Sequence, residues 1–344
     1  MLGLNSIRMR PDPNKAMEVT GTRRLTTDER TGLCVVPPMR PIHAILITYH
    51  PSDRVLDTVR DAAEQADHVI VVDNSATESA RNLLTQAFAP HTDRFTLIFN
   101  PVNLGVAAAL NIGMRTAQVG KAHWVLTLDQ DSRLTSGMVA ALIAAWEAMP
   151  REQRSQIGVL APQTVSADKT PSENTSAPIA NWREVETAIT SGCMICLEAW
   201  QAVGGFNEAL FIDYVDHEFC FRLRWNGWRV VQCPDAWLIH RIGNAEHRRL
   251  FGREITVNQH PPVRSYYIMR NGLYFWRAFP EPSAFIRADK RNTLTLLLKA
   301  LTVEPQRRER LSLFWRGYRD YRAGRFGAYS GPADVSPASE IHPV

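Results

Sequence analysis

The sequence predicts an α/β fold with a mainly parallel central sheet flanked by helices, followed by a C-terminal helical extension. Two observations support this prediction: short apolar runs alternate with amphipathic stretches from residue 41 onward, and several runs end in polar clusters. Strands that are apolar throughout are typical of sheets buried on both faces, and their alternation with helices is typical of parallel sheets. The chain has 344 residues, 45% of them hydrophobic, which is enough for one large domain with an extension or for two domains.

The predicted elements follow one another without long gaps. The strands are the apolar runs AILITY (44–49), HVIVVDNS (68–75), FTLIFN (95–100), HWVLTLDQDS (123–132) and IGVLAPQTV (157–165). The helices are the stretches between them, at 55–66, 77–89, 106–118 and 137–149. Such runs and stretches have the lengths expected of strands and of amphipathic helices.

The chain divides into four predicted segments. Residues 1–40 mix Pro, Thr, Arg and Met without periodicity, which indicates a flexible N-terminal arm. The α/β domain is expected over 41–245, a mainly helical extension over 246–330, and a flexible tail over 331–344.

Composition excludes some classes of protein. No apolar run approaches the roughly 18–20 residues of a spanning helix, so any membrane contact is expected to be peripheral. The five cysteines are odd in number and irregularly spaced, and no signal peptide is evident, so we expect a reduced, cytoplasmic protein. Cys193 and Cys196 spell CxxC, but there is no second pair to complete a zinc site, and we expect both to be packed in the interior.

Three predicted strands end in polar clusters, at 48–50, 73–75 and 129–132. In doubly wound folds ligands bind at the carboxyl ends of the strands, so three clusters at this edge indicate a site. Each has a structural alternative. The cluster at 73–75 could turn the chain and cap the next helix, and the cluster at 129–132 could begin a loop before the helix that opens near Thr135.

Two features favour a phosphorylated ligand. Asp129 and Asp131 repel each other, and a divalent cation would compensate; such a cation completes its shell with water and substrate phosphates. Asn103 and Gly105 precede an Ala-rich helix, where small residues and the helix amino end favour an anion. The stretch lacks GxGxxG and GxxxxGK[ST], which disfavours a dehydrogenase or an NTPase.

Six motifs in order carry a family resemblance. They are ILITYHPS, VIVVDNS, NPVNLGVAAALNIGM, WVLTLDQDS, TSGCMICLEAWQAVGGFNEALFIDYVDHEFCFRLRWNGW and LIHRIG. Together they resemble the family 2 glycosyltransferases of GT-A (Rossmann-like) fold, and among these the bacterial rhamnosyltransferases of cell-surface polysaccharide synthesis. The likeness covers about 41–245, and VRSYYIMRNGLYFWRAF (263–279) fits the same subgroup.

The resemblance implies roles at the donor side. Asp73 matches the residue that contacts the nucleotide base, and Thr48 lies on the matching first-strand loop near the same nucleotide. Asp129 and Asp131 match the Asp-x-Asp motif, through which Mg²⁺ or Mn²⁺ holds the sugar diphosphate. Such a cation would stabilise the charge that develops on the leaving diphosphate. His240 matches a place where several relatives carry a histidine near the metal, although a lone histidine is often only a packed or surface residue.

The resemblance also implies a catalytic base. Asp216 matches the carboxylate that takes the proton of the acceptor hydroxyl, which implies direct displacement with inversion at the anomeric carbon. The glutamate that usually precedes it is replaced by Val215, and Asp213 and Glu218 remain possible substitutes. An alternative is that Asp216 and Glu218 only complement a helix dipole.

Two further regions complete the expectations. Gly204, Gly205 and Phe206 resemble the acceptor-side loop, or else form a simple turn. The C-terminal part contains an apolar helix over 292–301 and a segment over 307–325 with seven arginines among aromatic residues. Basic and aromatic residues of this kind suit an anionic membrane surface, so 287–325 is a candidate peripheral contact, with packing on the catalytic domain as the alternative. Nucleic acid is not an expected partner, because no recognition module is evident.

The expected activity is transfer of L-rhamnose from dTDP-β-L-rhamnose to a lipid-linked saccharide or polysaccharide, in the cytoplasm or on the cytoplasmic face of the inner membrane. One alternative is the same fold with another donor, such as UDP-galactofuranose or UDP-glucose. A second is a binding module without activity, against which the presence of a candidate base at Asp216 argues.

Overall fold

The computed structural model describes residues 41–88, 93–166, 181–240, 245–250, 253–258, 261–302 and 304–331. The predicted arm (1–40) and all but the first residue of the predicted tail (331–344) lie outside the described residues. No helix in the described part of the chain is both long and apolar enough to cross a membrane.

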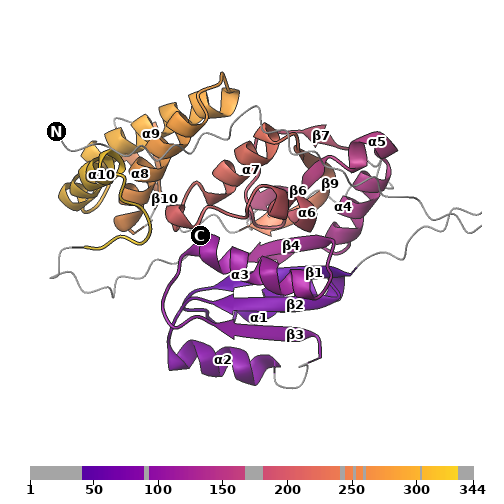
Figure 1. Cartoon of the computed structure of the whole chain (residues 1–344). Coiled ribbons are helices and arrows are strands. Elements are labelled where there is room, and N and C mark those ends of the chain that lie inside the picture. The colour runs from indigo at the N-terminus through magenta and orange to yellow at the C-terminus, as the bar shows by residue number, and fades with distance from the viewer. Residues whose placement is uncertain are drawn as a thin grey trace, which may run out of the picture. The chain divides into compact units, whose positions relative to one another are not determined.

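A nine-stranded sheet lies at the centre of the fold (Figure 1), in the order β3-β2-β1-β4-β8-β6-β9-β5 with β7 paired to β9. The strands are β1 (Ile42–Thr48), β2 (His68–Asp73), β3 (Phe95–Phe99), β4 (Trp124–Asp129), β5 (Arg133–Leu134), β6 (Ile157–Ser166), β7 (Arg183–Glu184), β8 (Met194–Cys196) and β9 (Arg229–His240). A separate antiparallel hairpin is formed by β10 (Ala245–Leu250) and β11 (Arg253–Asn258).

The sheet is mainly parallel, as the sequence predicted. Strands β3, β2, β1 and β4 pair in parallel, and so do β6 and β9. Strand β8 runs antiparallel to both β4 and β6, which joins the two parallel parts. The predicted α/β fold with a mainly parallel sheet is therefore confirmed.

The helices predicted at 55–66, 77–89, 106–118 and 137–149 are present within two residues of those bounds, and the helix predicted over 292–301 is longer than expected, beginning at Ala284. They are α1 (Val55–Gln65), α2 (Glu78–Phe88), α3 (Val106–Val119), α4 (Met138–Glu147), α5 (Arg151–Arg154), α6 (Leu197–Ala202), α7 (Val215–Trp225), α8 (Val263–Ala278), α9 (Ala284–Thr302) and α10 (Arg307–Arg322), with a short 3₁₀ helix over Glu208–Leu210. The hairpin β10–β11 was not predicted, because the extension was expected to be mainly helical.

The core explains why the central strands are continuous apolar runs. All seven residues of β1 are buried. Helix α3 lies directly against this strand: a Cβ atom added at Gly113 would come 2.6 Å from Cγ2 of Ile45. This close packing fixes the amino end of α3, which begins after Gly105, relative to the carboxyl ends of β1 and β2.

The C-terminal helices share the core of the sheet. Phe275 and Phe279, at the end of α8, and Ile286 of α9 belong to the same buried cluster as β1 and β4. Helix α10 packs on α8 so closely that a Cβ atom at Gly317 would lie 2.4 Å from the carbonyl oxygen of Tyr266. The extension thus contributes to the interior that supports the site.

Candidate active site

Thr48 and Asp73 lie side by side at the carboxyl ends of β1 and β2. They are paired in the sheet register and are both buried. Thr48 Oγ1 donates to Asp73 Oδ1 at 2.8 Å, and the backbone N–H and the hydroxyl of Ser75 also donate to the Asp73 carboxylate. Helix α2 begins five residues after Asp73, and its backbone N–H at Ala80 donates to Thr77. The cluster at 73–75 therefore holds its own carboxylate rather than capping that helix.

Asn103 and Gly105 shape the loop that enters α3. The N–H of Gly105 donates to Asn103 Oδ1 at 2.9 Å, and Gly105 has a φ of +85°. A Cβ atom there would lie 2.6 Å from the ring and from the carbonyl oxygen of Phe211, so only glycine fits. Asn103, Gly105 and the ends of β1 and β2 line one small pocket, whose lining residues are Ile47, Tyr49, Asn74, Asn103, Gly105, Val106, Phe211 and Ile212.

The structure brings Asp216 to the acidic pair Asp129 and Asp131, from which it is distant in sequence. Asp129 ends β4, Asp131 follows it, and Asp216 lies in the first turn of α7. Burial raises the pKa of Asp129 to about 7, and the charges of Asp131 and Asp216 add to this rise, while Arg264 opposes it. The site thus concentrates negative charge in a poorly solvated place.

A divalent cation fits this donor set. Two adjacent carboxylates are the ligands that a hard cation takes from a protein, with water and phosphate oxygens supplying the rest. No group of three or more His, Cys, Asp and Glu residues among the described ones could hold a metal ion by itself. The excess of carboxylate charge and the incomplete protein shell both suit an ion that is shared with a phosphorylated ligand.

His240, at the end of β9, lies beside this pair. Its Nδ1 is 3.0 Å from the hydroxyl of Ser132, which is 2.6 Å from that of Ser191. Burial lowers the pKa of His240, and the charge of Asp131 acts in the opposite direction. The Ser132 hydroxyl therefore orients the imidazole ring through its Nδ1 atom.

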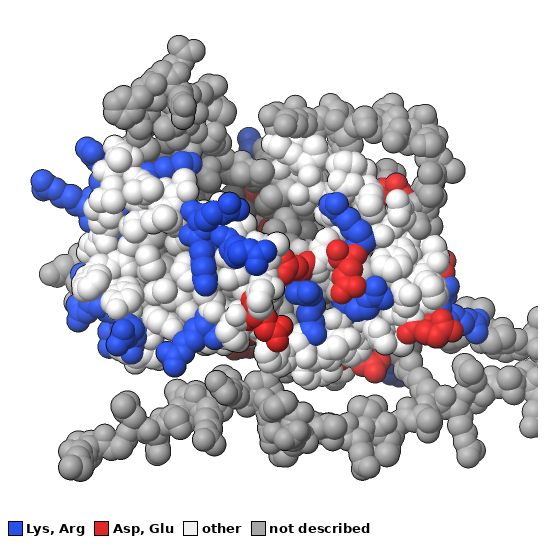
Figure 2. Space-filling model, turned by 90° about the horizontal axis from the view of Figure 1, so that it is seen from above, with Lys and Arg blue, Asp and Glu red and all other residues white. Residues whose placement is uncertain are grey.

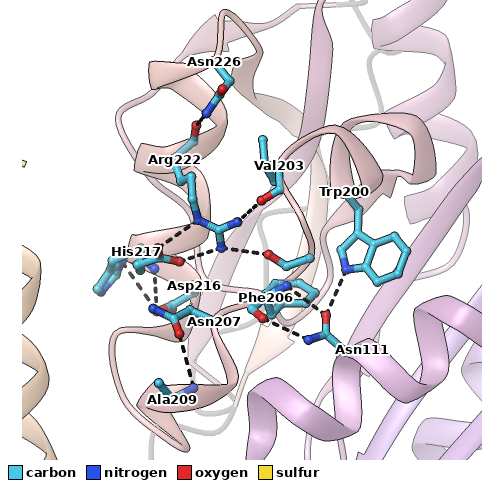
Figure 3. Close-up of polar contacts among 12 residues, drawn as sticks. Asn111, Trp200, Val203, Phe206, Asn207, Ala209, Asp216, His217, Arg222 and Asn226 are labelled. Atoms are coloured by element: carbon cyan, nitrogen blue, oxygen red, sulfur yellow. Dashed lines mark hydrogen bonds and ion pairs between the residues drawn. The ribbon is translucent and has the colours of Figure 1, made fainter. Parts of the chain in front are cut away.

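Asp216 differs from the two carboxylates that could replace it. Its Oδ1 accepts the N–H of His217 at 2.8 Å and lies 3.7 Å from His217 Nδ1 (Figure 3). Asp213 is held by the guanidinium of Arg264, and Glu218, which is buried, forms an ion pair with Arg222 at 2.8 Å. Both alternatives are therefore paired with arginines that are themselves partly buried.

Arg264, the second residue of α8, was not singled out from the sequence. Burial lowers the pKa of its guanidinium, but the charges of Asp213, Asp216 and Asp129 outweigh this effect and raise it. Arg264 is thus a cation whose charge acts on the carboxylate cluster. The only sequence signal was the motif VRSYYIMRNGLYFWRAF, which gives the subgroup but not the position of this side chain in space.

The loop before α7 has an unusual backbone. Phe211, Asp213 and Tyr214 all have positive φ values, of 67°, 61° and 66°, although none is glycine. Such conformations cost free energy and persist where the surroundings enforce them. The buried amide of Asn271 in α8 donates to the carbonyls of Leu210, Ile212 and Asp213, at 2.9, 2.7 and 3.0 Å.

Two more contacts tie the same loop to the C-terminal helices. Arg270, which is fully buried, donates to the carbonyl oxygen of Leu210 at 3.0 Å. The hydroxyl of Tyr214 donates to Asp289 of α9 at 2.8 Å, and the indole of Trp276 donates to the same oxygen. Helices α8 and α9 therefore fix the turn that carries Asp216.

Hydrogen bonds from Asn111 of α3 fix the predicted acceptor-side loop, which contains Gly204, Gly205 and Phe206. Asn111 of α3 accepts from Trp200 Nε1 and from the N–H of Phe206, and its amide donates to the carbonyl oxygen of Phe206 (Figure 3). Gly204 and Gly205 have φ values of +80° and +81°. The ring of Phe206 is 2% exposed and packs against Phe219, so it supports the loop from the core and does not offer its face to a ligand.

The cysteines of the CxxC stretch are packed in the interior, as expected. Cys193 and Cys196 are buried free thiols, at the edge of and within β8. Burial raises the pKa of both thiols. Neither is placed for redox or metal chemistry.

Comparison with known proteins gives two kinds of similarity. The chain matches the family model "Glycosyl transferase family 2" over residues 44–157. It is 30% identical over 254 residues to the dTDP-rhamnosyl transferase RfbF of Shigella flexneri, a match that covers 69% of this chain and 80% of the relative. It is also 27% identical over 167 residues to the uncharacterized protein Rv1525 of Mycobacterium tuberculosis, covering 46% of this chain and 58% of the relative.

Solved structures share the fold at low identity. GalNAc-T7 with UDP, GalNAc and Mn²⁺ superposes with a TM-score of 0.52 at 12% identity, covering 84% of this chain and 58% of that one. Residues 1–349 of TarS from S. aureus, in complex with UDP-GlcNAc, superpose with a TM-score of 0.51 at 14% identity, covering 83% and 81% of the two chains.

Proposed function

This chain belongs to glycosyltransferase family 2 and is a rhamnosyltransferase-like glycosyltransferase, and on that premise we propose that it acts by metal-dependent, inverting transfer. The observation that carries the proposal is the convergence of Asp129, Asp131 and Asp216 at the carboxyl edge of the sheet. An acidic pair suits the donor's diphosphate through a cation, and the third carboxylate suits proton removal.

The donor would lie along the ends of β1, β2 and β4. Asp73, fixed by Thr48 and Ser75, would accept the imide N–H of the base, and the Asn103–Gly105 loop would border the nucleotide. Asp129 and Asp131 would hold Mg²⁺ or Mn²⁺, with His240 as a further candidate ligand. When bound, the cation would supply positive charge to the diphosphate oxygens as the leaving group departs.

The base would be Asp216. An acceptor hydroxyl attacks the anomeric carbon from the face opposite the diphosphate, forming the new C–O bond while the bond to the diphosphate oxygen breaks. The electron pair leaves with the nucleoside diphosphate, and the hydroxyl proton passes to the Asp216 carboxylate. No covalent enzyme intermediate is required, and the configuration at that carbon inverts.

For the donor we propose dTDP-β-L-rhamnose, because a relative that is 30% identical over 69% of this chain is a dTDP-rhamnosyl transferase. A UDP-sugar is the alternative, since solved relatives of the same fold carry UDP or UDP-GlcNAc. For the acceptor we propose a lipid-linked saccharide or a polysaccharide. A lipid-linked acceptor would bring the enzyme to a membrane surface, with 287–325 as the candidate contact.

The test is transfer and hydrolysis by purified protein over a panel of dTDP-rhamnose, UDP-galactofuranose and UDP-glucose, with Mn²⁺ or with EDTA. We expect turnover of dTDP-rhamnose that needs metal, and a product of opposite anomeric configuration by NMR. Metal-dependent turnover of a UDP-sugar alone would keep the mechanism and reject the rhamnose donor. Nucleotide-sugar binding without any turnover would favour a binding module instead.

A further inference from the structure

Helix α9 exposes a regular stripe that the site does not use. Leu294, Leu298 and Leu301 are 56%, 52% and 49% exposed, and their spacing places them on one side of the helix. An adjoining side, about 100° around the helix, contains the buried residues Ile286, Thr293 and Ala300. Three exposed leucines in line are unusual for a helix that already has a packed face.

The same side of α9 is basic in its first half. Arg287 and Arg291 continue the stripe toward the amino end, in steps of four and three residues that lead to Leu294, and both are exposed. Neither arginine forms an ion pair within the described part of the chain. Asp289, the one acidic residue of α9, is on another side and accepts from Tyr214 and Trp276.

Helix α10 also exposes apolar and basic side chains. Its apolar residues Leu313 and Phe314 are buried, but Trp315 is 61% exposed and stacks on Tyr318. An open hollow near its carboxyl end is lined by Tyr318, Arg319, Arg322, Ala323 and Arg325. Lys and Arg side chains gather on the side of the molecule that carries the C-terminal helices, while most of the visible Asp and Glu lie toward the other side (Figure 2).

We propose that the exposed side of α9 docks on an anionic lipid surface. Cations followed by leucines along one side of a helix suit anionic head groups at one end and the acyl boundary at the other. The exposed tryptophan and the arginines of α10 are side chains of the kind found at lipid interfaces. A second copy of the chain would offer only leucines and cations from this side, with no carboxylate to pair with the arginines.

The proposal does not depend on the donor or on catalysis, and flotation of the full chain with lipid vesicles tests it directly. The two vesicles are phosphatidylcholine alone and an equal mixture of phosphatidylcholine and phosphatidylglycerol. The apolar variant is Leu294→Ser/Leu298→Ser/Leu301→Ser, and the charge variant is Arg287→Gln/Arg291→Gln. The matched control, Val119→Ser/Arg151→Gln, removes an exposed apolar side chain and an exposed cation elsewhere.

We expect the wild type and the control to float with the anionic vesicles and not with phosphatidylcholine alone. The charge variant should bind about thirtyfold more weakly, since each cation near an anionic surface contributes roughly a factor of five. The apolar variant should lose binding while its thermal midpoint stays unchanged. The proposal is wrong if the wild type binds neither vesicle, or if the apolar variant binds as the wild type does. It is also wrong if sedimentation shows a dimer that the leucine substitutions dissociate, because a second copy then covers the stripe.

Discussion

Asp129 is a carboxyl group that folding places among other carboxylates. Its pKa rises from 3.8 to about 7, chiefly through burial and then through Asp131 and Asp216. Because the native state holds this proton more tightly than the unfolded state, the free energy of unfolding should fall as the pH rises from about 4 to about 7. Without a cation, ionisation of Asp129 lowers the free energy of unfolding.

We therefore predict that Asp129→Asn stabilises the metal-free protein above pH 7. The gap in pKa corresponds to roughly 4 kcal/mol at most, and we expect about 2 kcal/mol because water at the pocket mouth screens the charge. The measurement is thermal unfolding in EDTA from pH 5 to pH 8. Glu198→Gln, an exposed carboxylate changed to an amide, serves as the control.

Added Mn²⁺ should make the wild type more stable than Asp129→Asn, which is the reverse of the order expected in EDTA. Metal ligands must be deprotonated, so added Mn²⁺ should stabilise the wild type at pH 8 and leave Asp129→Asn unchanged. A wild-type protein whose stability does not fall between pH 5 and pH 8 would contradict the placement of this carboxyl group.

The element that most influences the site is α8. The amide of Asn271 meets three carbonyls of a loop with three positive φ values, and that loop leads directly into Asp216. Asn271→Ala should destabilise the protein by about 2–4 kcal/mol, because buried carbonyls lose their donor. Transfer at a temperature where the variant is folded should fall as well, with kcat affected more than the donor KM.

Asn292→Ala, at an exposed position of α9 outside the leucine stripe, is the matched control and should change neither quantity. If Asn271→Ala loses stability but keeps the wild-type kcat, the loop does not depend on α8 to position Asp216.

The close crossing of α10 over α8 leads to a second prediction, which concerns helix packing. Gly317→Ala would bring a methyl group to 2.4 Å from the carbonyl oxygen of Tyr266, so the helices must separate. We expect a loss of about 1–3 kcal/mol in thermal or denaturant unfolding. Ser312→Ala, an exposed position on the same helix, should have little effect, and equal stability of the two variants would argue against this close crossing.

Elements with strong local signals could be predicted from the sequence. The apolar runs at 44–49, 68–75 and 157–165 correspond to β1, β2 and β6 within two residues, because a strand buried on both faces needs an unbroken apolar run. The antiparallel strand β8 has only three residues, and its partners are set by tertiary packing, which no local pattern reports.

The site residues also fall into those that the sequence indicates and those that only the structure reveals. The acidic pair, the glycine of the α3 loop and Asp216 have sequence signals, because their chemistry needs particular residue types. Arg264 and Asn271 lie in a motif that indicates the subgroup but not their positions in space, since their importance arises from contacts between α8 and a loop distant in sequence. Only the fold reveals that these side chains reach the site.

The whole molecule relates the C-terminal helices to both chemistry and location. Helices α8 and α9 hold the turn of Asp216 from one side, while α9 exposes its leucine and arginine stripe on the other. The predicted division into 41–245 and 246–330 describes the order of the chain, but the two parts share one core. A lipid-docked enzyme would therefore meet the membrane through the helices that also support its site.

In the proposed mechanism the acidic pair binds the donor through a cation, while Asp216 removes the acceptor proton. Calorimetric titration of dTDP-rhamnose into Asp216→Asn, with Mn²⁺ and then with EDTA, together with turnover of the same sample, tests it most directly. We predict wild-type donor affinity that requires Mn²⁺, and turnover lower by about 10²- to 10⁴-fold. Donor binding that is unchanged in EDTA, or near wild-type turnover without this carboxylate, would contradict the account.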